Sequence, residues 1–303
     1  MTTELHEIID RMEQGRILTK KGDRYSPATL TNFRNATRWV MAFERNASGR
    51  RFFDENYFSD LQVWLISQNL SKNSVAITLQ NIHAMLRHEK AISLPPLETA
   101  KSELTTAVYN TLEELRILGS LDLREVPGYD RVRDAYVLHC NMGLRFEDFV
   151  MVLRDINTYI VRDSGREYFK LKTGKAQEDV VIPVNRAAAG ILAKRKYSFD
   201  DAFSGQYYNK AIKWVGRQAG FTQKIAKNIT VGGRMTGKLY PKWQLMSSHT
   251  ARRSFATNAW LEKVAEADIM KITGHRSTSA FRKYLRADAL VKAVSLSDHP
   301  FFK

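Results

Sequence analysis

The sequence predicts a mainly α-helical protein of two domains, with a small antiparallel β-sheet in the second domain. Apolar residues recur at helical spacing through most of the 303 residues. The pair Pro95-Pro96 interrupts this pattern, because proline cannot continue a helix and favours an extended chain. Residues 159–184 instead contain short β-rich runs between turns. We therefore expect a helical domain over residues 1–94, a linker at about 92–106 and a mixed domain over residues 107–303.

The first domain is predicted to contain helices only. A weakly amphipathic segment opens the chain, and Ser26-Pro27 then marks a strong helix start, since Ser is a favoured N-cap and Pro suits the first helical position. This helix is expected to run to about Arg45, with a polar turn over residues 46–51. Two further helices are predicted over residues 57–69 and 74–90.

The second domain is predicted to alternate helices with one small sheet. Helical patterning resumes at Thr111, and Gly143 is expected to end a helix. Residues 222–246 are expected to be irregular and basic. The other predicted helices cover residues 130–141, 186–196 and 204–220, and the predicted strands cover residues 159–162, 167–172 and 179–184.

Charge is distributed unevenly between these domains. The formal net charge is +15. Residues 1–100 contain 13 Lys and Arg against 11 Asp and Glu, whereas the remaining residues contain 34 against 21. An excess of positive charge in the second domain suits a polyphosphate partner, although a merely soluble basic surface would carry the same charge. No apolar run is long enough for a membrane span, no secretory signal opens the chain, and the single Cys140 suits a reducing cytoplasm.

Three short helices are predicted near the end of the chain, each with a recognisable start or stop signal. We expect the first to begin after Ser247 or Ser248, the second to cover about Ala265–Thr273 and end at Gly274, and the third to begin after Ser277 or Thr278.

These helices carry His249, Arg252, His275 and Tyr284. A phenol can attack phosphorus, and a guanidinium group can donate two parallel hydrogen bonds to the non-bridging oxygens as charge builds. Imidazoles can transfer protons or donate hydrogen bonds. Each residue type is common by itself, so the joint pattern carries the inference. The set predicts attack on a phosphodiester without a metal ion.

The pattern of these residues resembles the tyrosine recombinase (phage integrase) family, most closely the integrases of phages and conjugative elements. It consists of His249-x-x-Arg252 followed by Arg-Ser-Phe-Ala-Thr, then Thr-Gly-His275, then Tyr284 nine residues later. The resemblance covers nearly the whole chain. It implies a helical core-binding domain and a catalytic domain that clamp duplex DNA. Only about 25 residues precede the first firm helix, so we expect no additional arm-binding domain.

The resemblance implies two more catalytic residues. Arg145 lies in a Gly-Leu-Arg context with Asp148 three positions later, as the family's first catalytic arginine does, although Met142 stands where Thr or Ala is usual. The family also places a mobile lysine in a β-hairpin, often in Lys-Thr-Gly. Lys172 matches that context, and Lys175 is the alternative. Without the resemblance, Arg145 could be a surface ion pair and both lysines could be solvated turn residues.

A site-specific DNA recombinase is the function that the resemblance implies. In that reading Tyr284 forms a 3′-phosphotyrosyl bond, which a 5′-hydroxyl of a partner strand later reverses. No cofactor or metal is expected, because ester exchange conserves the bond energy and the sequence has no Walker loop. A type IB topoisomerase and a catalytically silent DNA-binding regulator on the same fold remain alternatives. The expected roles are phosphate binding by Arg145 and Arg252, proton transfer by His249, a hydrogen bond to phosphate from His275, and protonation of the leaving oxygen by Lys172.

Double-stranded DNA is the expected partner. The basic residues Lys210, Lys213 and Arg217, on one predicted helix, and Lys175 are candidates to contact it. The family implies a monomer that assembles as a homotetramer on two duplexes in the cytoplasm, on the nucleoid, with possible accessory DNA-bending or directionality proteins. The tail that ends in Phe301-Phe302-Lys is expected to dock, either on its own domain or on a neighbouring protomer.

Overall fold

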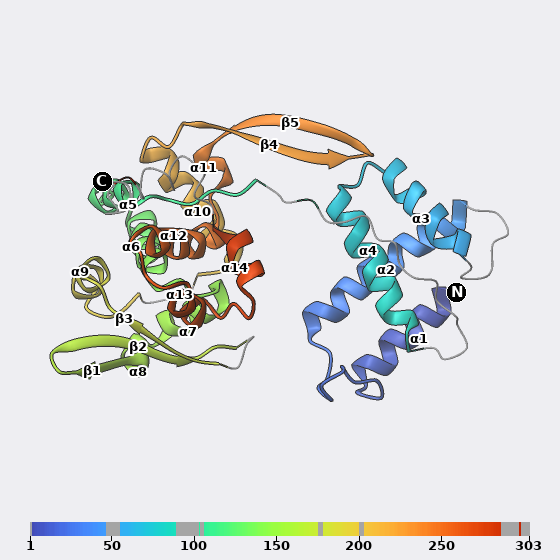
Figure 1. The fold of residues 1–303 in the computed structure, drawn as a ribbon, viewed down its shortest axis with the longest axis horizontal. Helices are drawn as coiled ribbons and strands as arrows, with labels where there is room; N and C mark the ends of the chain where they lie inside the picture. The colour runs from blue at the N-terminus through green and yellow to red at the C-terminus, as the bar shows by residue number, and fades with distance from the viewer. Residues whose placement is uncertain are drawn as a thin grey trace. The chain divides into compact units, whose positions relative to one another are not determined.

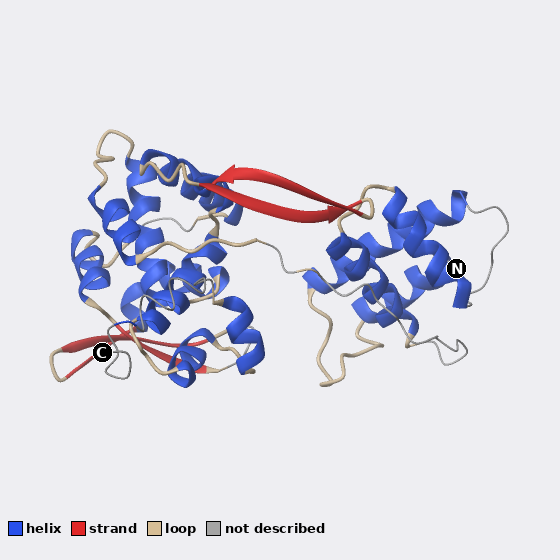
Figure 2. Cartoon of the chain, turned by 45° about the horizontal axis from the view of Figure 1, so that its top comes forward, coloured by secondary structure: helices blue, strands red, loops and turns tan. Residues whose placement is uncertain are grey.

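A computed structural model describes most of the chain, which divides into two units (Figures 1 and 2). The N-terminal unit comprises residues 1–106 and 226–238, and the C-terminal unit comprises residues 107–225 and 239–303. The described residues are 2–46, 55–88, 103, 106–174, 178–199, 203–285 and 297.

The N-terminal unit is helical, as predicted, and its helices enclose one apolar core. The Oγ of Ser26 accepts a hydrogen bond from the Thr29 amide at 3.2 Å, which confirms the predicted start of α2. The Oγ of Ser71 caps α4 by accepting a 3.1 Å hydrogen bond from the Ser74 amide. This helix therefore begins at Lys72, two residues earlier than predicted. The described helices of this unit before the hairpin are α1 (Thr2–Glu13), α2 (Pro27–Asn46), α3 (Glu55–Ser67) and α4 (Lys72–Leu86).

The C-terminal unit is built around α6, which is buried along most of its length. Helices α5, α9, α10 and α12 pack against α6, and Gly143 ends α6 in a left-handed conformation, as predicted. The described helices of this unit are α5 (Leu112–Ser120), α6 (Pro127–Met142), α7 (Phe146–Arg154), α8 (Ile156–Tyr159), α9 (Arg186–Lys194), α10 (Gly205–Gln218), α11 (Lys242–Leu245), α12 (Ser248–Leu261), α13 (Glu266–Thr273) and α14 (Thr278–Tyr284).

A buried group of ion pairs fastens α6 to α9. Asp134 is 3% exposed and receives Arg133 at 2.6 Å, Lys194 at 2.8 Å and Arg195 at 2.6 Å. Burial would raise the pKa of Asp134, but these three cations hold that pKa below its ordinary value. The carboxylate therefore stays charged and ties both helices together.

The predicted antiparallel sheet is present, in the order β1-β2-β3. Alternate side chains of β2 and β3 point into the core: Phe169 lies opposite Ile182, and Leu171 lies opposite Val180. This alternation explains why the sequence pattern revealed these strands. The strands are β1 (Ile160–Asp163), β2 (Arg166–Lys172) and β3 (Asp179–Pro183).

The prediction that residues 222–246 are irregular was wrong. Strands β4 (Lys224–Val231) and β5 (Arg234–Pro241) form a separate two-stranded ribbon, drawn as a pair of long red arrows in Figure 2. Gly232 and Gly233, with φ of 55° and 74°, form the turn, in which a positive φ favours glycine. Most of the ribbon is exposed. β5 therefore lacks the alternation of apolar and polar residues that reveals a half-buried strand, and in β4 Lys227 interrupts the less exposed face formed by Ile225, Ile229 and Val231.

The turn end of this ribbon belongs to the N-terminal unit, whereas the sequence had placed it in the second domain. The Gly232 amide donates to the Leu70 carbonyl at 3.2 Å, and Val231 forms an antiparallel bridge with Ser71. The Thr230 amide donates to the Glu103 carboxylate at 2.8 Å. The contacts with Leu70 and Ser71 attach the turn to the connection between α3 and α4, and the contact with Glu103 attaches β4 to a residue beyond α4.

Several predictions fall on residues outside the described part of the chain. They concern the polar turn after Arg45, most of the linker, Lys175, and the tail after Leu285 apart from Ser297. Among the helices that are described, none combines the length and the hydropathy needed to cross a membrane.

Candidate active site

Three helices, α12, α13 and α14, hold most of the predicted catalytic residues and follow one another in Figure 1. Their predicted boundaries are confirmed. The Ser247 amide donates to the Thr250 Oγ1 at 3.0 Å at the start of α12, and Gly274, with φ of 59°, ends α13. The Ser277 Oγ accepts from the Ala280 amide at 3.2 Å at the start of α14.

A small apolar cluster fixes α14, which carries Tyr284. Phe281 is 0% exposed and packs with Ala256 of α12 and Ile269 of α13. Tyr284 lies one turn after Phe281 and packs at the edge of the same cluster. The position of the phenol is therefore set by packing of all three helices.

Arg252 is 3% exposed and is held by two backbone carbonyls. Its Nη1 donates to the Gly143 carbonyl at 2.7 Å, and its Nη2 donates to the Thr273 carbonyl. Burial lowers the pKa of Arg252 to about 10, with the Arg145 charge acting in the same direction, so the group stays protonated at neutral pH. The guanidinium carbon lies 5.8 Å from the centre of the Tyr284 ring.

Arg145, from a distant part of the sequence, lies close to the backbone that binds Arg252. It is the N-cap of α7 and is partly buried, and its Nη2 lies 3.4 Å from the Gly274 carbonyl. Gly274 immediately follows Thr273, which binds Arg252. Two guanidinium groups therefore meet at one turn of backbone, the turn that ends α13.

His275 follows that turn and faces the phenol. Its Nδ1 lies 2.7 Å from the Thr273 Oγ1, and its ring centre is 5.0 Å from that of Tyr284. Burial first, and then the charges of Arg252 and Arg145, lower the pKa of His275 to about 4. The ring is therefore neutral at physiological pH.

His249 lies in the first turn of α12 and is exposed, unlike Arg252, His275 and Tyr284. Loss of hydration water lowers its pKa, and the charges of Arg253 and Arg252 add to this effect, while Glu147 opposes it. A lowered pKa makes the neutral imidazole, which can accept a proton, the main form at neutral pH.

The Tyr284 hydroxyl is buried. Among the described residues it has no hydrogen bond of ordinary geometry. Burial raises the pKa of Tyr284, whereas the positive charges of Arg252, Arg253 and Arg145 lower it. The phenol thus lies in a water-poor place surrounded by positive charge, which stabilises an anion that forms there.

Sequence reasoning missed Arg253, whose guanidinium carbon lies 5.3 Å from the centre of the Tyr284 ring. Its position next to Arg252 was the available signal, because adjacent helical residues can approach the same group from different sides. Thr273 was missed as well: its hydroxyl and carbonyl hold His275 and Arg252, and no motif emphasised it.

Lys172 lies at the exposed end of β2, opposite Asp179 in the sheet. The next turn is tied to α7, because the Gly174 amide donates to the Asp148 carboxylate at 2.8 Å. Asp148 lies three residues after Arg145 and is 5% exposed. The structure therefore connects the hairpin to the element that carries Arg145, without a described contact between Lys172 and the other predicted residues.

The predicted DNA-contacting residues Lys210, Lys213 and Arg217 occur at helical spacing on α10. Lys210 and Arg217 are exposed and Lys213 is partly exposed. The arginine also lies 5.9 Å from the centre of the Trp243 ring. The three cations therefore share one accessible face of the helix.

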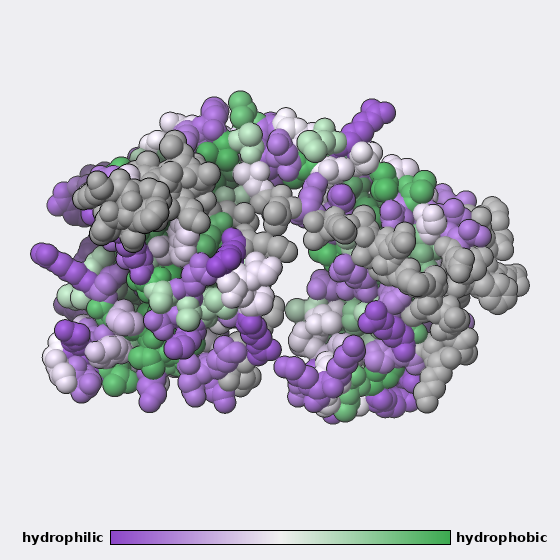
Figure 3. Space-filling view, in the orientation of Figure 1, coloured by the Kyte–Doolittle hydropathy of each residue, from purple (hydrophilic) through white to green (hydrophobic). Residues whose placement is uncertain are grey.

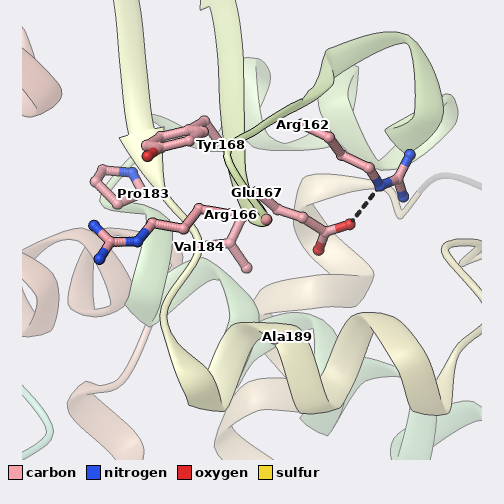
Figure 4. A pocket seen from close by; sticks show the side chains of 8 residues that line it. Arg162, Arg166, Glu167, Tyr168, Pro183, Val184 and Ala189 are labelled. Carbon is pink, nitrogen blue, oxygen red and sulfur yellow. Dashed lines mark hydrogen bonds and ion pairs between the residues drawn. The ribbon is translucent and has the colours of Figure 1, made fainter.

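Two pockets lined by described residues lie in the C-terminal unit. A pocket of about 560 Å³ lies between the sheet and α9, where Arg162 pairs with Glu167 and Tyr168 lies beside Pro183 (Figure 4). It contains none of the predicted catalytic residues. A second pocket, of about 510 Å³ and more open to solvent, includes His275. Hydrophilic side chains predominate on the described surface seen in Figure 3, which suits a large polar substrate.

Within the described residues, no group of three or more His, Cys, Asp or Glu side chains is arranged to hold a metal ion. The cluster at the α13–α14 turn consists instead of cationic, imidazole and phenol groups.

Solved recombinase structures resemble the chain over nearly its whole length. Lambda integrase residues 75–356, a dimer bound to a COC′ core site, is 16% identical, covering 94% of this chain and 96% of that chain with a TM-score of 0.65. XerH recombinase bound to palindromic difH substrate is 13% identical, covering 98% and 84% with a TM-score of 0.63. Tn1549 transposon integrase with transposon right-end DNA is 12% identical, covering 98% and 99% with a TM-score of 0.61.

No family model matches the chain, and no curated protein matches its sequence. The structural similarities show that this chain has the fold shared by these recombinases and integrases. The predicted fold class, mainly α with small antiparallel sheets in a tyrosine recombinase architecture, is therefore confirmed.

Proposed function

We propose that this protein is a site-specific DNA recombinase that cuts and rejoins DNA through a covalent bond to Tyr284. The observation that carries the proposal is the environment of this phenol: it is buried beside the guanidinium groups of Arg252 and Arg253 and the neutral ring of His275. Two guanidinium groups beside one ring place positive charge where the phenol oxygen would become an anion. The shared fold supports the same function.

In the proposed reaction the Tyr284 oxygen attacks a backbone phosphorus and displaces the 5′-oxygen of the next nucleotide. The bond from the phenol oxygen to phosphorus forms, the bond from phosphorus to the 5′-oxygen breaks, and a 3′-phosphotyrosyl ester remains. The phenol loses its proton, with His249 as acceptor, and the leaving oxygen gains one from Lys172. A 5′-hydroxyl from a partner strand reverses these steps, so the bond energy is conserved and no nucleotide is consumed.

Arg145 and Arg252 are proposed to bind the two non-bridging oxygens of the phosphate. Both guanidinium groups are already ordered on neighbouring carbonyls, so little reorganisation is needed as negative charge develops. His275 is proposed to contact the phosphate through Nε2, because its Nδ1 faces the Thr273 hydroxyl, whose own hydrogen is donated to the Ile269 carbonyl at 2.6 Å. Nδ1 therefore donates to Thr273, and Nε2 donates to the phosphate from the protonated ring, the form that a bound phosphate anion favours.

The proposed partner is duplex DNA, with Lys210, Lys213 and Arg217 contacting the backbone. Lambda integrase has been solved as a tetramer bound to a Holliday junction, and this structure is 15% identical with a TM-score of 0.59. We propose a homotetramer on two duplexes for this chain as well. The predicted division into a core-binding and a catalytic domain, and a location in the cytoplasm, belong to the same proposal.

A duplex with a nick close to the cleavage site tests the proposal. Cleavage releases the short fragment that carries the 5′-hydroxyl, so the reaction cannot reverse and the covalent adduct accumulates on a denaturing gel. A DNA-dependent adduct at Tyr284 is expected, and strand exchange between two duplexes should follow with intact sites. A protein that binds DNA without forming an adduct would be a silent regulator. One that relaxes supercoils without exchanging strands would be a type IB topoisomerase.

A further inference from the structure

The backbone turn that carries Arg145 is held from inside the core by His139, which has no part in the chemistry above. His139 lies on the last turn of α6 and is 0% exposed. Its Nε2 lies 2.9 Å from the Leu144 carbonyl oxygen, and its Nδ1 lies 3.2 Å from the Tyr208 hydroxyl. The imidazole stacks on Phe149 of α7 at 4.1 Å with an interplanar angle of 2°.

The hydrogens in this chain of contacts can be assigned. A carbonyl oxygen only accepts, so Nε2 of His139 carries the hydrogen and donates it to Leu144. Burial lowers the pKa of His139 to about 3, which keeps the ring neutral. The other nitrogen, Nδ1, then accepts from the Tyr208 hydroxyl. The hydroxyl hydrogen of Tyr208 and the Nε2 hydrogen of His139 each have an acceptor. The hydrogen bonds therefore all point the same way, from Tyr208 on α10 through His139 to the Leu144 carbonyl.

Fixing the Leu144 carbonyl also orients Arg145. The peptide unit is planar, so a bond to the Leu144 oxygen sets the plane that contains the nitrogen and Cα of Arg145. The carbonyl one residue earlier, that of Gly143, is held by Arg252 at 2.7 Å. An added Cβ at Gly143 would overlap the Phe255 ring, so this turn also leaves no room for a larger residue.

We infer that His139, oriented by Tyr208, is a positioning residue for Arg145 that keeps its guanidinium group where a DNA phosphate would bind. The inference rests on the proposed recombinase function and extends it to two buried residues that touch neither the DNA nor Tyr284. It makes the reactivity of the site depend on a hydrogen-bonded chain anchored in α10.

Replacement of His139 by three different side chains tests this role. The amide nitrogen of Gln reaches about as far as Nε2, whereas that of Asn reaches only as far as Nδ1. We expect His139→Gln to cleave the nicked duplex within a few-fold of the wild-type rate. His139→Asn and His139→Phe should be about 10- to 100-fold slower, because a small displacement of a catalytic group has effects of this size.

Two hydroxyl deletions complete the series. Tyr208→Phe removes only the group that orients the imidazole and should slow cleavage less than His139→Phe. Tyr136→Phe removes a buried hydroxyl from the same helix, α6, that binds Asn110 at 2.6 Å and does not reach the turn. This matched control should cleave at the wild-type rate. If His139→Phe fails to fold, the difference between His139→Gln and His139→Asn carries the test.

A substrate with an uncharged methylphosphonate at the cleaved position separates positioning from general damage. Without a negative charge to neutralise, cleavage depends much less on Arg145. Arg145→Ala and His139→Phe should therefore both be slow on phosphate and lose most of that defect on methylphosphonate. DNA affinity and thermal unfolding should be measured for every variant.

Equal defects of His139→Phe on both substrates, or a wild-type rate on phosphate, would overturn the role of His139 while leaving the proposed function intact. Absence of any adduct with the wild-type protein would overturn the proposed function, and this inference with it.

Discussion

The two parts of the candidate site differ in how they are held. Arg252 is buried and His275 and Tyr284 are partly buried, in a cluster in which carbonyls, a hydroxyl and neighbouring rings set each position. Lys172 lies at the exposed end of a hairpin, whose turn is tied to the rest by one bond from Gly174 to Asp148. The difference suggests separate demands. Groups that bind the phosphate must be ordered beforehand, whereas a proton donor must reach an oxygen that leaves.

The largest expected effect tests the buried side of this comparison. Tyr284→Phe keeps the ring and its packing but removes the attacking oxygen, so it should bind DNA normally and form no covalent adduct. A nicked duplex and a denaturing gel measure this. Tyr240→Phe serves as a control and should form the adduct as the wild type does. An adduct in Tyr284→Phe, or one mapped to Tyr240, would contradict the assignment of the nucleophile.

The next effect distinguishes two arginines within the cluster. Arg145→Ala and Arg252→Ala should each slow cleavage by about two to four orders of magnitude, as loss of one charged donor does in comparable sites. Arg252→Ala also leaves the buried carbonyls of Gly143 and Thr273 without a donor and should cost about 1–3 kcal/mol of stability.

Thermal unfolding of both arginine variants measures this difference in stability. The more exposed Arg145 makes one long bond to a carbonyl, so Arg145→Ala should unfold close to the wild-type temperature. If the two variants unfold at the same temperature, Arg252 is not the better-anchored residue.

The exposed side of the comparison depends on Lys172. If it protonates the leaving oxygen, Lys172→Ala should slow cleavage of ordinary DNA and recover on a substrate whose 5′-oxygen is replaced by sulfur, since a thiolate leaves without a proton. Arg145→Ala should gain little from the same substrate, because its role is to bind charge. Recovery of Lys175→Ala in place of Lys172→Ala would move the role to Lys175.

The smallest expected effect concerns stability in acid. Burial lowers the pKa of His139 to about 3, compared with about 6.5 in the unfolded chain, so the unfolded state binds the extra proton first. Stability from this group is present above pH 6.5 and is lost as the pH falls towards 3. At pH 5 the loss should be about 2 kcal/mol.

Urea unfolding at pH 7 and pH 5 checks the acid effect. The fall in unfolding free energy between the two pH values should be smaller in His139→Gln, which has no titrating ring. His275, whose pKa is lowered to about 4, acts in the same direction and remains in both proteins. An unchanged pH dependence in His139→Gln would contradict the assignment of the acid effect to His139.

The sequence predicted those elements whose local signals are strong. Caps at Ser247 and Ser277 and the stop at Gly274 set the three helices of the site, so their residues could be placed together in advance. The β4–β5 ribbon was missed because none of its residues is fully buried, so apolar and polar residues alternate too weakly to mark it. His139 was also missed, since a lone histidine on a buried helix shows its hydrogen-bond partners only after the chain has folded.

The turn at Gly232 has a consequence for how the protein can be made and divided. Residues 226–238 complete a unit whose other residues end at 106, so the ribosome synthesises more than one hundred residues of the second unit before the first is complete. A fragment that stops at residue 106 would leave the Leu70 carbonyl and the Glu103 carboxylate without the backbone amides they bind. The helical unit is therefore not encoded by one continuous stretch of the gene. Exchanging it between proteins would require replacing both residues 1–106 and residues 226–238.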